Sequence, residues 1–431
     1  MGFKVLQGGT VISFDDTTQR VVVLPNTSIF IQDDRIHAMT PTDSTELPHD
    51  AEIIDVTGKI LCPGFINTHV HMWETVYRTL GPDVVLSRYF SDWLWQNLKK
   101  TAEVFRPNDV YVSCLEGYLE GLNGGVISFL DHAHNNWHKD VVKPSFDAAV
   151  DSGARVWWCY DVADRESFPM NEQWDELSDI SSKTSKDSGT GLEYTREMIR
   201  KLKLKALTVH HLGGPWPAAN TSPAELCRLK LHSDECPIIF SHAPLMTEEE
   251  QHALREHDSF ISITPESEFH FGHGQKTGHL VSEQASLGLD TNWTFSGDML
   301  SQARLWLQTV RLNKFHRTLE EGKSLAMKRR DIGVLQVGAK ADILVFNGDS
   351  PNMLGWSNAV AAVMLHANIG DIERVLVDGK FRKRDFRLVN LKTEWSEVKD
   401  SFLEASIRIQ QLVSVPPPMP EKLWARGNLG M

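Results

Sequence analysis

The sequence predicts an α/β protein in which a barrel of alternating strands and helices lies between two strand-rich chain ends. From about residue 62 to about residue 330, apolar strand-like runs alternate with amphipathic helical segments, as in a TIM-like (β/α)8 barrel. Residues 1–60 and 333–390 read instead as short alternating strands separated by turns. We therefore divide the chain into 1–60, 61–330, 331–392 and 393–431, the last holding a C-terminal helix and tail.

The candidate barrel strands are apolar runs that end in polar or turn residues. They cover residues 61–68, 125–131, 154–161, 205–210, 237–242, 260–264 and 286–290. The active site of such a barrel lies at the carboxyl ends of its strands. Side chains that close these runs are therefore the first candidates for a site.

The stretch PGFINTHVH at 63–71 closes the first of these strands with two histidines. Alternate side chains of a strand share a face, so His69 and His71 would point the same way and reach one metal ion. Imidazole nitrogen is a preferred ligand of zinc and similar divalent metals. An isolated His-x-His is a weak signal, because short histidine patterns recur by accident.

Three further residues close downstream strands, namely His210 in KALTVHH, His242 in PIIFSHAP and Asp290 in SLGLD. Each has an ordinary structural explanation, since a single histidine after a strand is often a core or loop residue and a strand-ending aspartate often caps a helix. Five residues in the order His-x-His, His, His, Asp favour a metal centre over coincidence.

These motifs resemble the amidohydrolase superfamily, and within it the branch that holds triazine hydrolases and cytosine or guanine deaminases. The resemblance covers most of the chain and rests on GKILCPGFINTHVH, GGVISFLD at 124–131, FSHAP at 240–244, ITPESE at 263–268, SLGLD at 286–290 and DIGVLQVGAKADILVF at 331–346. It implies that the two chain ends pair into one small β-sandwich beside the barrel. It also implies one divalent metal ion, zinc or alternatively iron.

Carried over residue by residue, the resemblance implies that His69, His71 and His210 bind the metal. Which of the neighbours His210 and His211 is the ligand stays open. Asp290 would touch the metal and act on its water, and His242 would contact the substrate or that water. A divalent cation lowers the pKa of bound water from about 15.7 toward about 7, so Asp290 would accept its proton while hydroxide attacks an electron-poor carbon.

One position departs from the resemblance. Deaminases of this branch carry a glutamate three residues after the third histidine, where it protonates the substrate, but here that position is Gly213, or Gly214 if His211 is the ligand. A replacement acid would have to come from Glu266, Glu268 or His242, although both glutamates read equally well as loop anchors. We therefore expect leaving groups that need little protonation, such as chloride, to be favoured over ring amines.

Two stretches are short for a complete eight-stranded barrel. Between the strands at 154–161 and 205–210 the segment DELSDISSKTSKDSGTGLEYT is polar and turn-rich, so a fourth strand is not convincing there. After the helix near 298–322 the chain passes directly into DIGVL, where the family normally inserts a longer segment. Completeness of the barrel is therefore left open.

Polar and aromatic residues on the loops after the strands are candidates for substrate contacts. In a barrel these loops form the mouth of the site, where rings stack on a planar substrate and polar groups donate hydrogen bonds. Loop packing explains each of them equally well when it is taken singly. The candidates are Trp73, Arg78, His132, His134, Glu268, His270 and Trp293, with His273 on the same loop as His270.

Composition fits a cytoplasmic enzyme, whereas the small-molecule substrate is what the resemblance implies. With 44 basic and 57 acidic residues the formal net charge is −13, which argues against nucleic acid and anionic membranes as partners. The five cysteines lack Cys-x-x-Cys spacing and fit reduced thiols, and the N-terminus has no long apolar run. From Thr393 onward, apolar residues at helical spacing predict a helix that either packs on the barrel or contacts a second copy in a homodimer. Those residues are Trp395, Val398, Phe402, Ile409 and Leu412.

Two functions follow from these observations. The first is a metal-dependent hydrolase that cleaves a non-peptide C–N bond, or a C–Cl bond, of a small cyclic or heteroaromatic molecule. The alternative is a catalytically reduced, metal-binding relative with a role in binding or assembly. The complete ligand set favours the first, whereas Gly213 and the short stretches favour the second.

Overall fold

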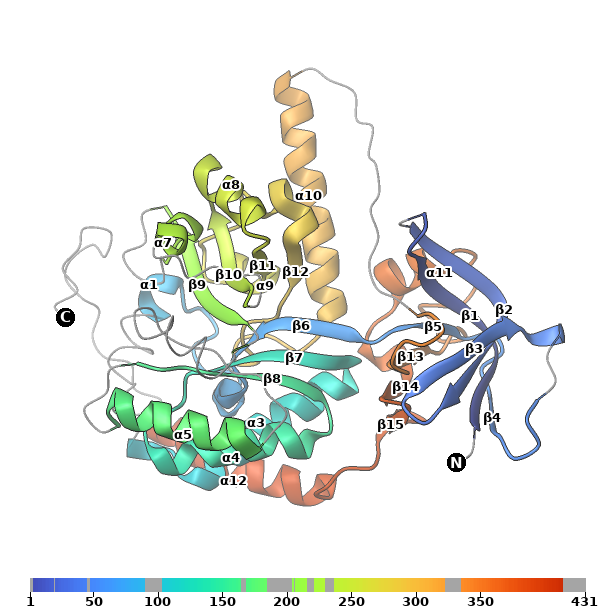
Figure 1. Cartoon of the computed structure of the whole chain (residues 1–431), viewed down its shortest axis with the longest axis horizontal. Coiled ribbons are helices and arrows are strands. Elements are labelled where there is room, and N and C mark those ends of the chain that lie inside the picture. The colour runs from blue at the N-terminus through green and yellow to red at the C-terminus, as the bar shows by residue number, and fades with distance from the viewer. Residues whose placement is uncertain are drawn as a thin grey trace.

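A computed structural model describes residues 3–18, 20–44, 47–89, 103–163, 168–183, 204, 206–214, 221–228, 236–321 and 335–413. Within this part of the chain the strands form one mixed sheet and two parallel sheets. Figure 1 shows the mixed sheet on one side of the molecule and the two parallel sheets, with most of the helices, on the other.

Both chain ends build the mixed sheet. Its order is β16-β15-β14-β13-β5-β1-β2-β3, with β4 paired to β1. The strands are β1 (Phe3–Asp15), β2 (Arg20–Gln32), β3 (Arg35–Pro41), β4 (Glu52–Asp55), β5 (Ile60–Pro63), β13 (Ile343–Phe346), β14 (Ile372–Val377), β15 (Lys380–Arg384) and β16 (Arg387–Leu388). The ends meet where β13 pairs antiparallel with β5. Apolar side chains from both ends, such as Leu6, Ile29, Leu61 and Ile343, share one buried core.

The parallel strands have the order expected of a barrel. One sheet holds β6 (Phe65–Val70), β7 (Val126–Ala133) and β8 (Arg155–Tyr160), and the other holds β9 (Leu207–Gly213), β10 (Ile238–Leu245), β11 (Phe260–Ile263) and β12 (Ala285–Leu287). β6 lies beside β12, because a parallel bridge joins Val70 to Asp290 and the Thr68 hydroxyl lies 2.8 Å from that of Ser286 in β12. The resulting order is β8-β7-β6-β12-β11-β10-β9, as in a (β/α)8 barrel.

Helices cover the outside of these strands. In Figure 1, α3, α4 and α5 lie along the sheet β6–β8, and α10 stands beside β12. The α-helices are α1 (Leu86–Arg88), α3 (Pro107–Asn123), α4 (Lys139–Ser152), α5 (Met170–Lys183), α7 (Pro223–Arg228), α8 (Glu248–Glu256), α9 (Pro265–His270), α10 (Met299–Glu321), α11 (Ala359–Ala361) and α12 (Trp395–Val413). Shorter turns are η1 (Thr42–Ser44), η2 (Met72–Tyr77), η4 (Gly278–Gln284), η5 (Ala362–His366) and η6 (Ile369–Asp371). None of the helices in the described ranges is long and apolar enough to cross a lipid bilayer.

The predicted barrel strands are present, with ends that differ by a few residues. The first prediction, 61–68, proves to be two strands, because the chain leaves the mixed sheet through β5 and enters the barrel as β6 with only Gly64 between them. A side chain at Gly64 would collide with Ile127 of β7, so glycine lets the joint pack tightly. The two stretches predicted to be short fall largely on residues 164–167, 184–203 and 322–334, which lie outside the described residues.

The predicted C-terminal helix is α12, and it packs on the barrel. Val398, Phe402 and Ile409 are buried as predicted, and α12 contacts α3 and η2. Trp395 and Leu412, predicted for the same apolar face, are largely exposed. The prediction was wrong for these two. Trp395 is the first residue of α12, and Leu412 lies off the buried stripe, which continues at that end through Ile409 and Val413.

Candidate metal centre

The backbone fixes Asp290 against the His-x-His pair. His69 lies in β6 and His71 follows it directly. The Asp290 N–H donates to the His69 carbonyl at 2.8 Å, and the His71 N–H donates to the Asp290 carbonyl at 2.7 Å. Asp290 also has a positive φ of 77°, an uncommon backbone conformation for a residue with a side chain. Backbone hydrogen bonds and the positive φ of Asp290 thus fix its side chain beside both histidines.

Hydrogen bonds turn the Nε2 atoms of both histidines toward this carboxylate. His71 donates from Nδ1 to the His132 carbonyl at 3.1 Å, and the Nδ1 of His69 lies 2.9 Å from the Ser241 hydroxyl. The Asp290 Oδ1 atom is then 3.1 Å from His69 Nε2 and 3.4 Å from His71 Nε2. Metal-binding histidines are typically oriented in this way, with the second ring nitrogen bonded to a carbonyl or hydroxyl.

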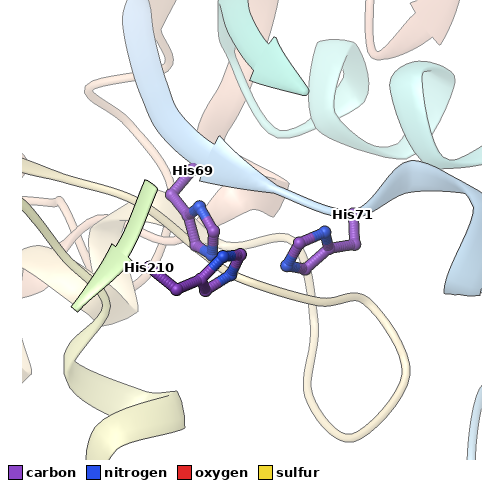
Figure 2. A group of neighbouring side chains, drawn as sticks. All are labelled: His69, His71 and His210. Atoms are coloured by element: carbon purple, nitrogen blue, oxygen red, sulfur yellow. The ribbon is translucent and has the colours of Figure 1, made fainter. Parts of the chain in front are cut away.

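His210 completes this group (Figure 2). Its ring stacks on that of His71 at 5.3 Å between centroids, and the His69 ring is 4.9 Å away. One nitrogen from each of the three residues lies within 4.8 Å of the other two. His211, the neighbour left open by the sequence, points to the opposite side of β9, where its Nε2 is 3.5 Å from Glu250 Oε1. The structure therefore brings His210 to the pair.

His242 lies at a strained turn next to the same group. His242 and Ala243 have φ of 70° and 46°, a region that costs most residues of order 1–3 kcal/mol. The turn is held by Gln275, whose amide donates to the His242 carbonyl at 3.0 Å, and by Thr264, whose hydroxyl is 2.8 Å from His242 Nδ1. The His242 ring is 5.0 Å from His69, and a second group of mutually close donor atoms consists of His69, His242 and Asp290.

The electrostatics of the group suit a cation. Burial alone would raise the pKa of Asp290, but hydrogen bonds from His69 and His71 hold it well below its usual range. Burial lowers the pKa of His210 and of His242 well below 6.5, so both imidazoles are neutral, which is the form that binds metal. For His71, burial is outweighed by Asp290 and Glu74, which raise its pKa to about 9.

Three of the predicted substrate-binding residues do lie around the group. His132 contacts His69 directly, with its Nε2 3.0 Å from His69 Nδ1 and 2.8 Å from the Thr208 hydroxyl. The His134 ring is 4.3 Å from that of His71, and the buried Trp73 ring is 5.3 Å from His134. His132 thus packs against His69, whereas His134 contacts His71 and Trp73 packs against His134.

The other four predicted residues have different partners. Arg78 pairs with Glu116 and Glu120 on α3, at 2.9 and 2.8 Å, so its guanidinium is committed to a structural ion pair. The Trp293 indole N–H donates to the Leu80 carbonyl, and the His270 ring packs on Phe271 and Phe295. Glu268 is fully buried and accepts hydrogen bonds from the Thr264 N–H at 3.0 Å and the Gln275 amide at 3.2 Å. These contacts support the fold of the site and the His242 turn.

Glu74 was missed by the sequence reasoning. It is buried in η2, its Oε1 accepts from the Tyr89 hydroxyl at 3.3 Å, and His134 Nε2 is 3.9 Å away. Burial raises the pKa of Glu74 to about 7. Its position three residues after His71 was the available signal, because one helical turn brings a residue back to the face of the residue three before it. Ser241 and Thr208 were also missed, since a lone hydroxyl in a strand has no distinctive pattern.

Gly213 has no room for a side chain. Its φ is +71°, and a Cβ atom there would lie 2.5 Å from the carbonyl oxygen of Leu245 on the paired strand β10. From the sequence, Gly213 was notable as the position that lacks the acid of the deaminases. The geometry adds that the backbone itself requires glycine at this position.

The chain resembles curated deaminases over most of its length. It is 23% identical over 395 residues to a 5-methylthioadenosine/S-adenosylhomocysteine deaminase of Thermococcus sibiricus, which covers 82% of this chain and 88% of the relative. It is 24% identical over 406 residues to a 5'-deoxyadenosine deaminase of Methanobrevibacter smithii, covering 85% of this chain and 90% of the relative.

Solved structures share the fold. An adenosine deaminase from Xanthomonas campestris with bound zinc matches with a TM-score of 0.79 at 16% identity, covering 95% of this chain and 98% of the other. An atrazine chlorohydrolase from Arthrobacter aurescens, also with zinc, matches with a TM-score of 0.77 at 18% identity, covering 94% and 100%. These matches support the barrel with its added β unit. Since the model of the Amidohydrolase family also matches residues 60–281, more than half of the chain, the protein belongs to the amidohydrolase family.

Proposed function

We propose that this chain binds one divalent metal ion, zinc, and hydrolyses a C–N or C–Cl bond of a small nitrogen heterocycle. The observation that carries the proposal is the convergence of His69 Nε2, His71 Nε2 and an Asp290 oxygen, with His210 beside them. Relatives named as adenosine-type deaminases, and a structural neighbour named as an atrazine chlorohydrolase, support a heteroaromatic substrate.

The donor set suits zinc, because imidazole nitrogens with a carboxylate oxygen are typical zinc ligands. His69, His71 and His210 would hold the ion, with Asp290 as the fourth donor. When bound, the ion supplies Lewis-acid activation of a water molecule. Asp290 is kept ionised by its histidine neighbours, so it accepts the proton of the attacking water. His242, held by Thr264 and Gln275, faces the same space and contacts the substrate.

The lack of a positioned acid determines which leaving group the hydrolysis favours. Gly213 supplies no acid. Burial raises the pKa of Glu268 well above its usual range, but its two carboxyl oxygens are held by the Thr264 N–H and the Gln275 amide. We therefore propose that chloride or an activated amine leaves more readily than an unactivated ring amine. The alternative of a catalytically reduced relative has no support from the comparisons. A cytoplasmic location remains part of the proposal, supported by five cysteines that form no disulfide.

The test is turnover by the zinc-loaded protein. The substrate panel is 5'-deoxyadenosine, 5'-methylthioadenosine, adenosine, guanine and atrazine, with ammonia and chloride release as readouts. Elemental analysis should give about one metal per chain for the wild type. The double variant His69→Ala with His71→Ala should lose this metal. Asp290→Asn should keep much of the metal but lose about 10²–10⁴-fold in rate, because an amide cannot accept the proton.

The matched control is His252→Ala, which removes an imidazole that is 80% exposed on α8. It should leave metal content and turnover unchanged. Unchanged metal content in the double histidine variant would overturn the ligand assignment. Near-wild-type rates for Asp290→Asn would exclude this carboxylate as the base. A zinc-loaded protein that neither binds nor converts any compound of the panel would refute the substrate class.

A further inference from the structure

His273 is a buried imidazole that the proposed chemistry leaves unused. It lies on the loop that follows α9 and is only 8% exposed. Neither Nδ1 nor Nε2 has a hydrogen-bond partner among the residues that the structure describes. A buried polar group without a partner costs about 1–3 kcal/mol, and such groups are rare in folded proteins. His211 also lacks a hydrogen bond at both nitrogens, but it has Glu250 at 3.5 Å.

The unpartnered ring faces the metal centre. Its edge meets the His242 ring at 5.4 Å between centroids, with an interplanar angle of 77°. The His242 ring in turn lies 5.0 Å from His69 and 5.5 Å from His210. The negative charge of Asp290 also acts on His273, which places the imidazole within electrostatic reach of that carboxylate. His273 therefore extends the row of histidines on the side of His242.

The loop holds His273 in place by a set of specific contacts. The Gln275 amide donates to the His242 carbonyl at 3.0 Å and to Glu268 Oε2 at 3.2 Å, and its oxygen accepts from the Gly278 N–H at 2.9 Å. The Gly274 N–H donates to the Glu268 carbonyl at 2.7 Å. Because the flanking Gly272 and Gly274 have φ of +84° and +68°, the chain can turn on both sides of the histidine.

We propose that His273 is a substrate-contacting residue whose imidazole hydrogen-bonds a ring nitrogen or carbonyl oxygen of the heterocycle. Burial lowers the pKa of His273 to about 4, so the neutral ring offers one N–H donor and one lone pair. Such a donor polarises a ring nitrogen without transferring a proton to it. The inference rests on the proposed function and deepens it, because it restricts the substrate to heterocycles with an acceptor on the side of His242.

The test uses zinc-loaded, full-length His273→Phe, which keeps an aromatic ring but removes both nitrogens. Probes are the panel compound that the wild type converts best and its deaza analogues, in which one ring nitrogen at a time is replaced by CH. We expect KM for the parent compound to rise about 10- to 100-fold, the effect of losing one buried hydrogen bond. Metal content should not change, and the unfolding midpoint should stay equal or rise, since an unpaired buried polar group is replaced by an apolar one. The deaza analogue that lacks the ring nitrogen contacted by His273 should bind to the wild type and to the variant equally well.

Lys276→Ala, an exposed position on the same loop, is the control and should leave KM unchanged. Partial recovery of KM by His273→Gln, which restores a donor and an acceptor, would support hydrogen bonding over shape. An unchanged KM in His273→Phe while the wild type turns over the compound would overturn the inference and leave the proposed function intact. An equal increase in KM for the parent compound and for every deaza analogue would also overturn the inference. Failure of the wild type on the whole panel would instead refute the proposed function.

Discussion

Substituting Gly213 by alanine should destabilise the protein more than the same change at Gly58 or Gly214, two other glycines with a positive φ. Its φ of +71° costs a residue with a Cβ atom about 1–2 kcal/mol. The Cβ atom would also lie 2.5 Å from the Leu245 carbonyl oxygen, and that backbone is held by the pairing of β9 with β10. Forcing packed atoms apart adds about 1–3 kcal/mol. We expect a total loss of about 2–5 kcal/mol in the free energy of unfolding.

Two other glycines separate these contributions. Gly58 has φ of +74° and nothing within 4 Å of an added Cβ, so Gly58→Ala should show only the backbone cost. Gly214 has φ of +62° and meets the end of the Leu245 side chain at 2.7 Å, which can move, so Gly214→Ala should be intermediate. Urea unfolding monitored by circular dichroism would rank the three variants. Equal losses for Gly213→Ala and Gly58→Ala would refute the steric argument and make a glutamate at Gly213 feasible.

Three further outcomes are expected. Burial lowers the pKa of His71, but Asp290 and Glu74 outweigh it and raise that pKa to about 9, so a proton competes with the metal for this imidazole. Below pH 9, zinc affinity should therefore increase by up to about tenfold for each unit by which the pH is raised. Chelator competition at pH 6.5–8.5 would measure this slope, and an affinity independent of pH would contradict the prediction. Arg78→Met should cost about 1–3 kcal/mol in unfolding free energy, less than for a fully buried pair because the guanidinium is partly exposed, and it should spare metal content; loss of the metal instead would place Arg78 at the site. Removing zinc with a chelator should lower the free energy of unfolding of the wild type by about 2.7 kcal/mol, for free zinc at 100 times its Kd, and hence lower the unfolding midpoint. The same treatment should leave the His69→Ala, His71→Ala double variant unchanged.

The barrel and the five strand-end residues could be predicted because strand periodicity fixes which side chains share a face. Parallel strands that run in the same direction carry these residues, so their proximity follows from the fold. His69, His210 and His242 lie within such strands, and His71 and Asp290 follow the ends of β6 and β12. The choice between His210 and His211 could not be made from sequence, since a shift of one residue in the register of β9 would exchange them.

The loop residues were harder to predict because their partners lie far away in sequence. Arg78 finds Glu116 and Glu120 on α3, and Glu268 finds the Gln275 amide, so neither needs a substrate to satisfy its charge. Glu74 and His273 show the reverse case, in which a residue without a conspicuous motif is buried beside the candidate metal centre. Sequence patterns identify residues that can bind a ligand, but competing partners decide which of them remain available.

The pairing of β5 with β13 has a consequence for how the chain folds during synthesis. Ile60 pairs with Phe346, so the mixed sheet cannot close until almost the whole barrel has left the ribosome. Until then β5 exposes one unpaired edge, and unpaired edges template aggregation. Contacts this distant in sequence also slow folding, because a long loop must close before they form. Ribosome-stalled chains that end before residue 343 should therefore be more protease-sensitive at β1 and β5 than chains that extend past residue 390.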